Sequence, residues 1–306
     1  MIAWILEFLL LVLMPIVPPG TPSYELKLPF TPIYKMISDH GNVLVVVNKQ
    51  LSIRALALPS GRELRNVDGH NAVGGAISPS GKWLAIATRD NKVILYSTAT
   101  KAKKMLDVKK HVETMTFLDK GLLQVNKTLW DISVMRPVVT LKTEFGPVTA
   151  VAISRDGTRL ATGGGDTVVR LYDTKSWKLI SHYNGLKLEP FGLSFTPDGS
   201  RLIVGGIDDR LTMLNVSDFK EIKSFHSGES GVTGVEPVGK SGWVAVHYID
   251  ARTDKPKAWR LVNINSGSNK SLSGAKTVVK IIDGKILCFR FEGKTLTATI
   301  EELPHG

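Results

Sequence analysis

The feature that most constrains the fold of this chain is a glycine that recurs at a nearly constant interval along most of its length. These glycines follow short apolar runs and lie in polar turns, at Gly41, Gly81, Gly121, Gly157, Gly199, Gly242 and Gly284. Their successive spacings are 40, 40, 36, 42, 43 and 42 residues. A tight hairpin turn needs a positive φ, which a residue without a Cβ atom adopts at little cost. The spacing therefore predicts seven units, each long enough for four short strands.

Three of the units are similar enough to be aligned by eye. They begin at Ala76, Ala152 and Leu193, and each holds an apolar strand, a polar turn ending in Gly, a second strand leading into an Asp-containing turn, and a third strand. The run Val43–Val47 is short and wholly apolar, as expected for a strand buried on both faces. Short strands, even spacing and hairpin turns exclude a helical solenoid.

These features predict an all-β fold, a seven-bladed β-propeller over residues 24–303. A ring of blades has to close, and the usual device completes one blade with strands from both chain ends, which removes the free sheet edge. The last unit supplies only three strands, at 277–281, 286–291 and 295–300. Residues 24–28 are alternating and otherwise unassigned, so we expect this N-terminal strand to complete the last blade.

A short apolar stretch precedes the repeats. Residues 1–17 read MIAWILEFLLLVLMPIV, in which Glu7 is the only charged side chain. We interpret residues 1–20 as a short apolar helix, a signal or membrane-anchor segment that gives a membrane-anchored or secreted protein. An uncleaved anchor, a signal peptide and a buried or mis-started segment stay open, because the stretch is barely long enough to span a bilayer and lacks a basic n-region. A cytoplasmic protein is the alternative.

The repeats resemble those of the WD-repeat family. Leu129, Trp130 and Asp131 supply the characteristic dipeptide in the third unit, and Tyr172 and Asp173 a conservative version in the fourth. The resemblance covers roughly residues 33–300. It implies that an Asp in the turn between the second and third strands braces the blade; the matching residues are Asp90, Asp166 and Asp208. The Gly-His pair of the family occurs only at Gly69 and His70, so no blade is expected to hold the full hydrogen-bonded tetrad of the family.

Charge and residue content bear on the type of ligand. The net charge of +11 favours contact with polyanions. The basic residues are scattered apart from two runs, Lys101, Lys103, Lys104, Lys109 and Lys110, and Arg252, Lys255, Lys257 and Arg260. We interpret both runs as solvated loop charges and predict no nucleic-acid ligand, because no aromatic platform is interleaved with them. Polyanion binding by the first run remains a further hypothesis.

The sequence holds no catalytic or cofactor motif. It has no Gly-rich phosphate loop, no Gly-x-Ser-x-Gly elbow and no paired-His zinc motif, and Cys288 is its only cysteine. We predict no cofactor, no metal, no small-molecule substrate and no enzymatic activity. The alternative is a propeller enzyme of the hydrolase or lactonase type with its site at the central channel, where Glu189 and Asp209 are candidate residues.

The resemblance favours a non-catalytic scaffold that binds protein or peptide partners through the loops on one rim of the propeller. The candidate partner-binding residues are His70, Arg89, Asn91, Phe145, Glu189, Phe191, Asp209 and Glu229. Phe145 and Phe191 are the strongest of them, because an aromatic ring beside charged groups is a common interface anchor. Packing between blades is an equally good interpretation of both rings.

Overall fold

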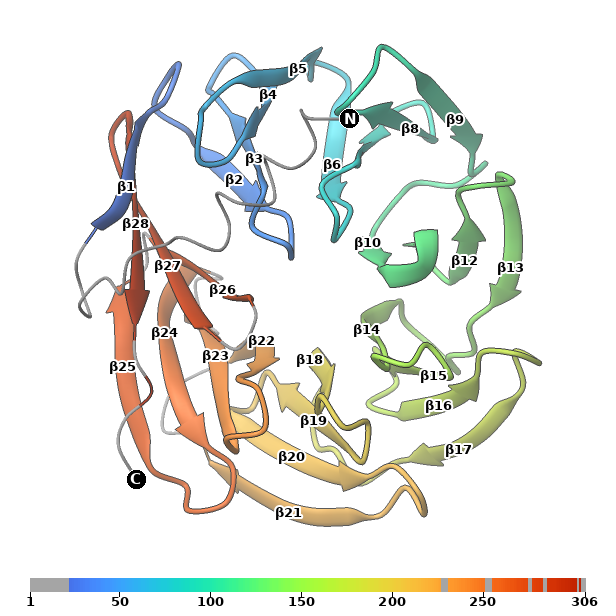
Figure 1. The fold of residues 1–306 in the computed structure, drawn as a ribbon. Coiled ribbons are helices and arrows are strands. Elements are labelled where there is room, and N and C mark those ends of the chain that lie inside the picture. Colours follow the sequence, from blue (N-terminus) through green and yellow to red (C-terminus); the bar gives the residue numbers. More distant parts are fainter. Residues whose placement is uncertain are drawn as a thin grey trace, which may run out of the picture.

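Seven four-stranded antiparallel sheets stand in a ring around a central opening (Figure 1). The computed structural model describes residues 22–226, 231–250, 255–274, 277–282, 285–301 and 303. In six sheets the strands follow chain order, with the first strand beside the opening and the fourth at the periphery (Figure 1). The predicted all-β, seven-bladed propeller is confirmed.

The strands have the following bounds, blade by blade from the inside outwards. Blade 1 contains β2 (Tyr34–Ile37), β3 (Val43–Val47), β4 (Ser52–Ala57) and β5 (Glu63–Asp68). Blade 2 contains β6 (Ala72–Ile77), β7 (Trp83–Thr88), β8 (Lys92–Ser97) and β9 (Lys103–Asp107). Blade 3 contains β10 (Met115–Leu118), β11 (Leu122–Val125), β12 (Thr128–Asp131) and β13 (Arg136–Thr140). Blade 4 contains β14 (Val148–Ile153), β15 (Arg159–Gly164), β16 (Val169–Asp173) and β17 (Leu179–Tyr183).

The remaining blades follow the same plan. Blade 5 contains β18 (Pro190–Phe195), β19 (Arg201–Gly206), β20 (Arg210–Asn215) and β21 (Glu221–His226). Blade 6 contains β22 (Val232–Pro237), β23 (Trp243–Asp250), β24 (Lys255–Asn263) and β25 (Asn269–Gly274). Blade 7 contains β26 (Thr277–Ile282), β27 (Lys285–Glu292), β28 (Thr295–Glu301) and β1 (Pro22–Lys27). The one helical turn in the described part of the chain is a 3-10 turn at Asp119–Gly121.

The last blade joins strands from both ends of the chain. β1 pairs antiparallel with β28, with Leu26 opposite Leu296 and Lys27 opposite Thr295. Every sheet in the ring thus has four strands. The apolar helix expected over residues 1–20 lies outside the described residues. Within the described ranges, no helix has the length and hydropathy needed to cross a membrane.

The recurring glycines lie between the first and second strands of their blades, as the spacing predicts. Six of them have positive φ angles, Gly41 at 67°, Gly81 at 73°, Gly121 at 73°, Gly157 at 77°, Gly199 at 71° and Gly242 at 76°. A residue with a Cβ atom rarely adopts a positive φ, which explains why glycine occupies these positions. The seventh, Gly284, lies outside the described residues.

Adjacent blades pack through apolar clusters, and glycines in the second strands allow the closest approaches. A Cβ atom added at Gly163 would lie 2.6 Å from Cγ of Pro190 in the next blade, and one at Gly205 would lie 2.3 Å from a methyl carbon of Val232. Gly163 and Gly205 are therefore positions where adjacent blades pack closely.

The antiparallel order gives the ring two distinct rims. We call upper rim the one formed by the loops that link successive blades and by the turns between second and third strands. Its loops include 69–71, 108–114, 141–147 and 184–189, and its turns include 48–51, 89–91, 165–168 and 207–209. The lower rim carries the turns between first and second strands and the loops between third and fourth strands.

Candidate functional site

Six of the predicted rim residues lie on the upper rim. His70, Phe145 and Glu189 belong to loops between blades, and Arg89, Asn91 and Asp209 to turns between second and third strands. Phe191 is the second residue of the inner strand β18. Glu229 lies outside the described residues. The topology thus brings these six residues to one face of the ring.

The two phenylalanines differ in environment. Phe145 is 63% exposed in the loop between blades 3 and 4, so its ring is offered to solvent. Phe191 is half-buried and lines the wall of the central channel with Leu193. Only Phe145 therefore has the exposure expected of an anchor for a large partner.

Several polar residues of the upper rim are held by neighbours. Asp209 accepts a hydrogen bond from Nδ1 of His226 at 2.6 Å. The carboxylate of Asp68 contacts both the ring and the backbone N–H of His70, and these hydrogen bonds lower the pKa of Asp68. Asp90 accepts from Nδ2 of Asn71 at 3.1 Å and pairs with Nζ of Lys92 at 2.7 Å.

Asp166 braces the loop that carries Phe145. Its carboxylate accepts the backbone N–H of Glu144 at 2.7 Å and binds both terminal nitrogens of Arg170, at 2.6 and 3.1 Å. Burial opposes ionisation of Asp166, but the hydrogen bonds from Arg170 and Glu144 outweigh it and hold its pKa below the usual value. This contact, like that of Asp90 with loop 69–71, agrees with the bracing role that the family resemblance implies.

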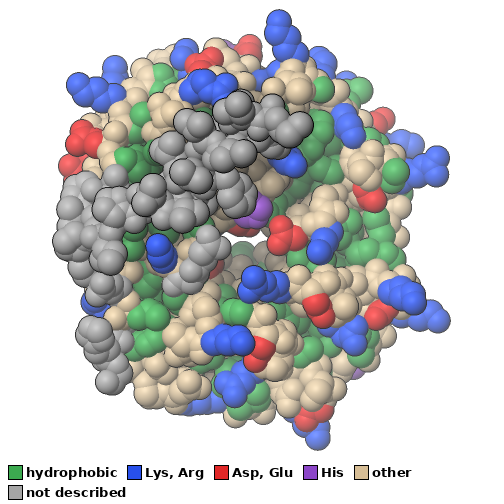
Figure 2. Space-filling view, viewed as in Figure 1, with side chains coloured by type: hydrophobic (Ala, Val, Ile, Leu, Met, Phe, Trp, Pro, Cys, Tyr) green, Lys and Arg blue, Asp and Glu red, His purple; other side chains and the backbone are tan. Residues whose placement is uncertain are grey.

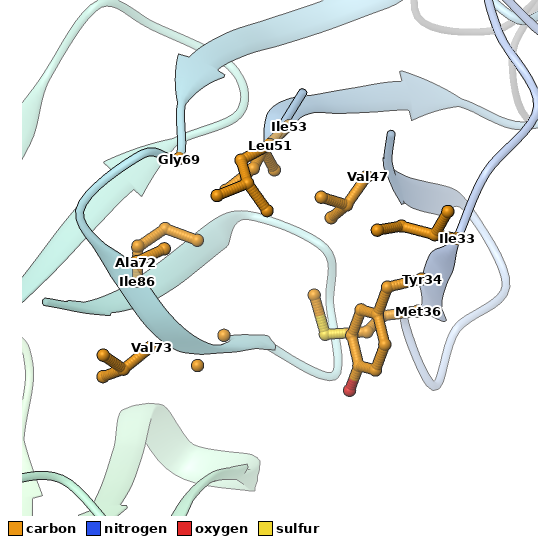
Figure 3. Close-up of a pocket in the computed structure, with 12 residues that line it drawn as sticks. Ile33, Tyr34, Met36, Val47, Leu51, Ile53, Gly69, Ala72, Val73 and Ile86 are labelled. Carbon is orange, nitrogen blue, oxygen red and sulfur yellow. The ribbon is translucent and has the colours of Figure 1, made fainter. Parts of the chain in front are cut away.

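An apolar pocket opens on the upper rim between blades 1 and 2 (Figure 3). Its volume is about 300 Å³, near the lower end of the range for ligand sites. The lining residues come from β2 and the residue before it, the end of β3 and the following turn, β4, the loop 69–71, β6 and β7. They are Ile33, Tyr34, Met36, Val47, Leu51, Ile53, Gly69, Ala72, Val73, Gly74, Gly75 and Ile86. In Figure 3 the side chains of Met36, Leu51 and Ala72 converge on the space between the two blades.

Glycines in the inner strand β6 explain why this space is empty. A Cβ atom added at Gly74 would meet nothing within 4 Å, and one at Gly75 would make only ordinary contacts, the nearest at 3.4 Å. Gly75 lies opposite Ile86 on the face of β6 that is turned to blade 1, so the space beside Met36 of β2 receives no side chain from it, whereas Gly74 lies opposite Ala87 on the other face of the sheet. The result is an apolar concavity at the inner edge of the ring, where a partner's side chain can enter.

The large exposed apolar side chains in the described part of the chain fall into two groups. Five surround the upper rim and the pocket: Ile33, Tyr34, Val73, Phe145 and Leu188. The others lie on outer strands or in the loop at 132–135, and are Met105, Val134, Leu179, Ile180 and Ile222. Three members of the first group, Ile33, Tyr34 and Val73, line the pocket between blades 1 and 2. Ile33, Tyr34, Val73 and Leu188 were not among the predicted site residues. The adjacent Gly74 and Gly75 were the one sequence feature that pointed to this part of the surface.

The central channel is lined by hydroxyls and a salt-bridged cluster. Thr116, Thr149 and Ser194 contribute the hydroxyls. On β26, Nζ of Lys280 lies 2.7 Å from Oδ1 of Asp39 and 3.2 Å from Oε1 of Glu236. Burial disfavours the charge on Lys280, but the two carboxylates outweigh it and raise its pKa above the usual value. Its ammonium is thereby committed to bridging blades 6, 7 and 1.

The channel shows no metal-binding constellation among the residues that the structure describes, since no three His, Cys, Asp or Glu side chains there are grouped to hold an ion. Glu189 and Asp209, the candidates of the enzyme hypothesis, are in upper-rim segments outside the lining of the channel pocket. Figure 2 shows the channel opening at the centre of one face, with basic and acidic side chains interspersed around it.

The first lysine run does not form one patch. Lys101, Lys103 and Lys104 lie at or near the lower rim, whereas Lys109 and Lys110 lie on the upper rim, because β9 runs between the two groups. Lys104 also donates to the carbonyl oxygens of Ile132 and Ser133, at 3.0 and 3.3 Å. The lysines of this run therefore do not form one continuous surface.

Two segments of the chain match a known protein family. Residues 61–97 and 135–173 match the family model described as WD domain, G-beta repeat. The chain is 29% identical over 106 residues to the periodic tryptophan protein 2 homolog of Schizosaccharomyces pombe, across 35% of this chain and 12% of that protein. It is 25% identical over 186 residues to protein HIR1 of Kluyveromyces lactis, across 54% of this chain and 19% of that protein. The matches thus span less than a fifth of these relatives.

A solved structure has the same architecture over nearly the whole chain. A chain in the crystal structure of a mitotic checkpoint complex superposes with a TM-score of 0.71, and the match covers 92% of this chain and 96% of that one. The sequence identity is 16%, so this similarity supports the fold alone.

Proposed function

We propose that this seven-bladed β-propeller, two segments of which match the WD-repeat family model, is a non-catalytic scaffold that binds protein partners through its upper rim. The similarity of this chain to WD-repeat proteins favours a role in binding other proteins. The binding partners of these relatives are not inferred for this chain, because the matched regions are a small part of those proteins.

One observation carries the choice of rim. The exposed apolar side chains Ile33, Tyr34 and Val73 border an apolar pocket there, and Phe145 projects from a braced loop on the same rim. Removal of large apolar side chains from water is the main favourable contribution at most protein interfaces. Loops on a rigid β scaffold can present such side chains at a low entropic cost.

The experiment is affinity capture with two matched triple variants of the full chain. Ile33→Ser/Tyr34→Ser/Phe145→Ser removes exposed apolar groups from the upper rim. Met105→Ser/Val134→Ser/Ile180→Ser removes comparably exposed groups from elsewhere. Proteins captured by the wild type are expected to be lost from the first variant and kept by the second. Equal capture by both variants, or no capture by the wild type, would contradict the proposal.

The apolar residues 1–20 support a second part of the proposal, attachment to a membrane or export across one. Their near-continuous apolar run is the observation behind it. Cell fractionation combined with sequencing of the mature N-terminus separates the outcomes: an intact N-terminus in the membrane fraction indicates an anchor, and a cleaved one a signal. An intact chain in the soluble cytoplasmic fraction would contradict this part and leave the scaffold role unaffected.

A further inference from the structure

We infer that the pocket between blades 1 and 2 binds an extended acidic peptide segment of a protein partner, with one large apolar side chain of the segment inserted into the pocket. This inference rests on the proposed scaffold function and specifies the partner's chemistry. It depends on three features of the described residues: the shape of the pocket, its apolar lining and the charges beside it.

The shape of the pocket fits a side chain. A volume of about 300 Å³ holds a large aliphatic or aromatic group but is small for a cofactor. The space exists because Gly75, which faces Met36 of β2, presents no side chain there, and Val73 is exposed at the edge. An inserted apolar group would take the place that a side chain at position 75 would otherwise fill.

The segments that form the pocket wall also carry charged side chains, and in the described part of the chain those that form no salt bridge are basic. Lys49 belongs to the turn at 48–51, which contributes Leu51 to the lining. Arg89 follows β7, and its backbone N–H donates to the carbonyl oxygen of Asn71 at 3.0 Å, which holds it against the loop beside Ala72. Both side chains are exposed, and within the described residues neither forms a salt bridge.

The acidic side chains nearby are already paired. Asp68 is bound by His70, and Asp90 by Lys92 and Asn71. Two basic groups thus remain on either side of an apolar pocket, in a chain whose net charge is +11. Acidic residues that flank the inserted side chain would complement Lys49 and Arg89, whereas basic residues would be repelled. The surroundings of the pocket therefore favour an acidic segment.

The test uses a display library of random short peptides selected on the folded full-length protein. The recovered peptides are then synthesised with a fluorescent label and titrated by anisotropy. We expect them to share one large apolar residue followed or preceded by Asp or Glu. Peptides without acidic residues, or failure to recover any peptide, would overturn the inference.

Four variants locate the binding site: two fill or block the pocket, one reverses the charges beside it, and one is a control on the lower rim. Gly75→Leu fills the pocket with only ordinary van der Waals contacts at Cβ and is expected to weaken binding at least about tenfold, the loss of one buried side chain. Lys49→Glu/Arg89→Glu is expected to weaken it by about tenfold, with a smaller effect at high salt. Arg155→Glu/Lys175→Glu makes the same charge change on the lower rim and should leave binding unchanged. Ile33→Asp/Val73→Asp, at the exposed edge of the pocket, gives a second means of blocking it.

The result also separates this inference from the scaffold function. If partner capture depends on Ile33, Tyr34 and Phe145 but peptide binding is unaffected by Gly75→Leu in a folded protein, the pocket assignment is wrong and the scaffold function stands. If capture is independent of the upper rim, both are wrong. Thermal unfolding followed by circular dichroism establishes that each variant is folded.

Discussion

The carboxylate of Asp166 illustrates how one residue links the stability of a blade to the interaction surface. The side chains of Asp166 and Arg170 are only 1% and 8% exposed, and the same carboxylate holds the loop that presents Phe145. The family resemblance identified Asp166 as a brace. The resemblance did not identify Arg170 as the partner of Asp166. A partner four residues further along, in the strand that follows the hairpin turn, follows no periodic sequence pattern.

Replacing Asp166 with Ala should destabilise the protein by about 3 kcal/mol, because Arg170 would be left as an uncompensated buried charge. The double variant Asp166→Ala/Arg170→Met should cost less than the single one, since it removes both charges. Urea unfolding of the wild type and the two variants at neutral pH measures both differences. A double variant less stable than Asp166→Ala would contradict the prediction.

The same pair should make stability depend on pH. The pKa of Asp166 in the folded protein is below its ordinary value of 3.8, so the unfolded chain binds the proton more readily. The stabilisation is therefore complete above about pH 4 and is lost as the pH falls through the folded-state pKa. The stability difference between the wild type and Asp166→Asn, measured by urea unfolding, should shrink below pH 4. A difference that grows on acidification would show that the sign is wrong.

At the scale of a strand or turn, local sequence patterns were enough to predict the blades but not the empty spaces between them. The turn glycines were predictable because positive φ is a property of one residue, and Val43–Val47 was identified with its observed bounds. Gly163 and Gly74 look alike in sequence, each followed by another glycine in a strand. One faces Pro190 and the other faces open space, and this difference depends on which residue the neighbouring blade places opposite.

The two glycines should respond in opposite ways to the same substitution. Gly163→Ala should destabilise the protein by about 1–3 kcal/mol, because the new methyl group would overlap the ring of Pro190. Gly74→Ala should be neutral or slightly stabilising, because it meets no atom and reduces the freedom of the unfolded chain. Denaturant unfolding of the two single variants compares them directly. Equal losses would mean that the packing between blades 4 and 5 is not as tight as described.

At the scale of the whole ring, contacts between distant parts of the chain hold the first and last blades together. β1 and β28 pair near the periphery, and Lys280 joins Asp39 and Glu236 at the channel. The Lys280 cluster could not be foreseen, because it unites residues from three blades whose facing side chains depend on the closed geometry. For the same reason the lysines between positions 101 and 110 looked like one patch in the sequence but lie on opposite rims.

The Lys280 cluster predicts that a single side chain at the channel contributes measurably to closure of the ring. Lys280 is 16% exposed, so its loss leaves Asp39 and Glu236 facing each other without a counter-charge. Lys280→Ala should cost about 2 kcal/mol, less than a fully buried pair because Asp39 is 60% exposed and retains hydration. Lys285→Ala, which removes an exposed lysine from the adjacent strand, should change stability by less than about 0.5 kcal/mol. Calorimetric unfolding of both variants tests this expectation, and equal stability of the two would mean that the blades are held together by β1–β28 pairing and interblade packing, without help from the cluster.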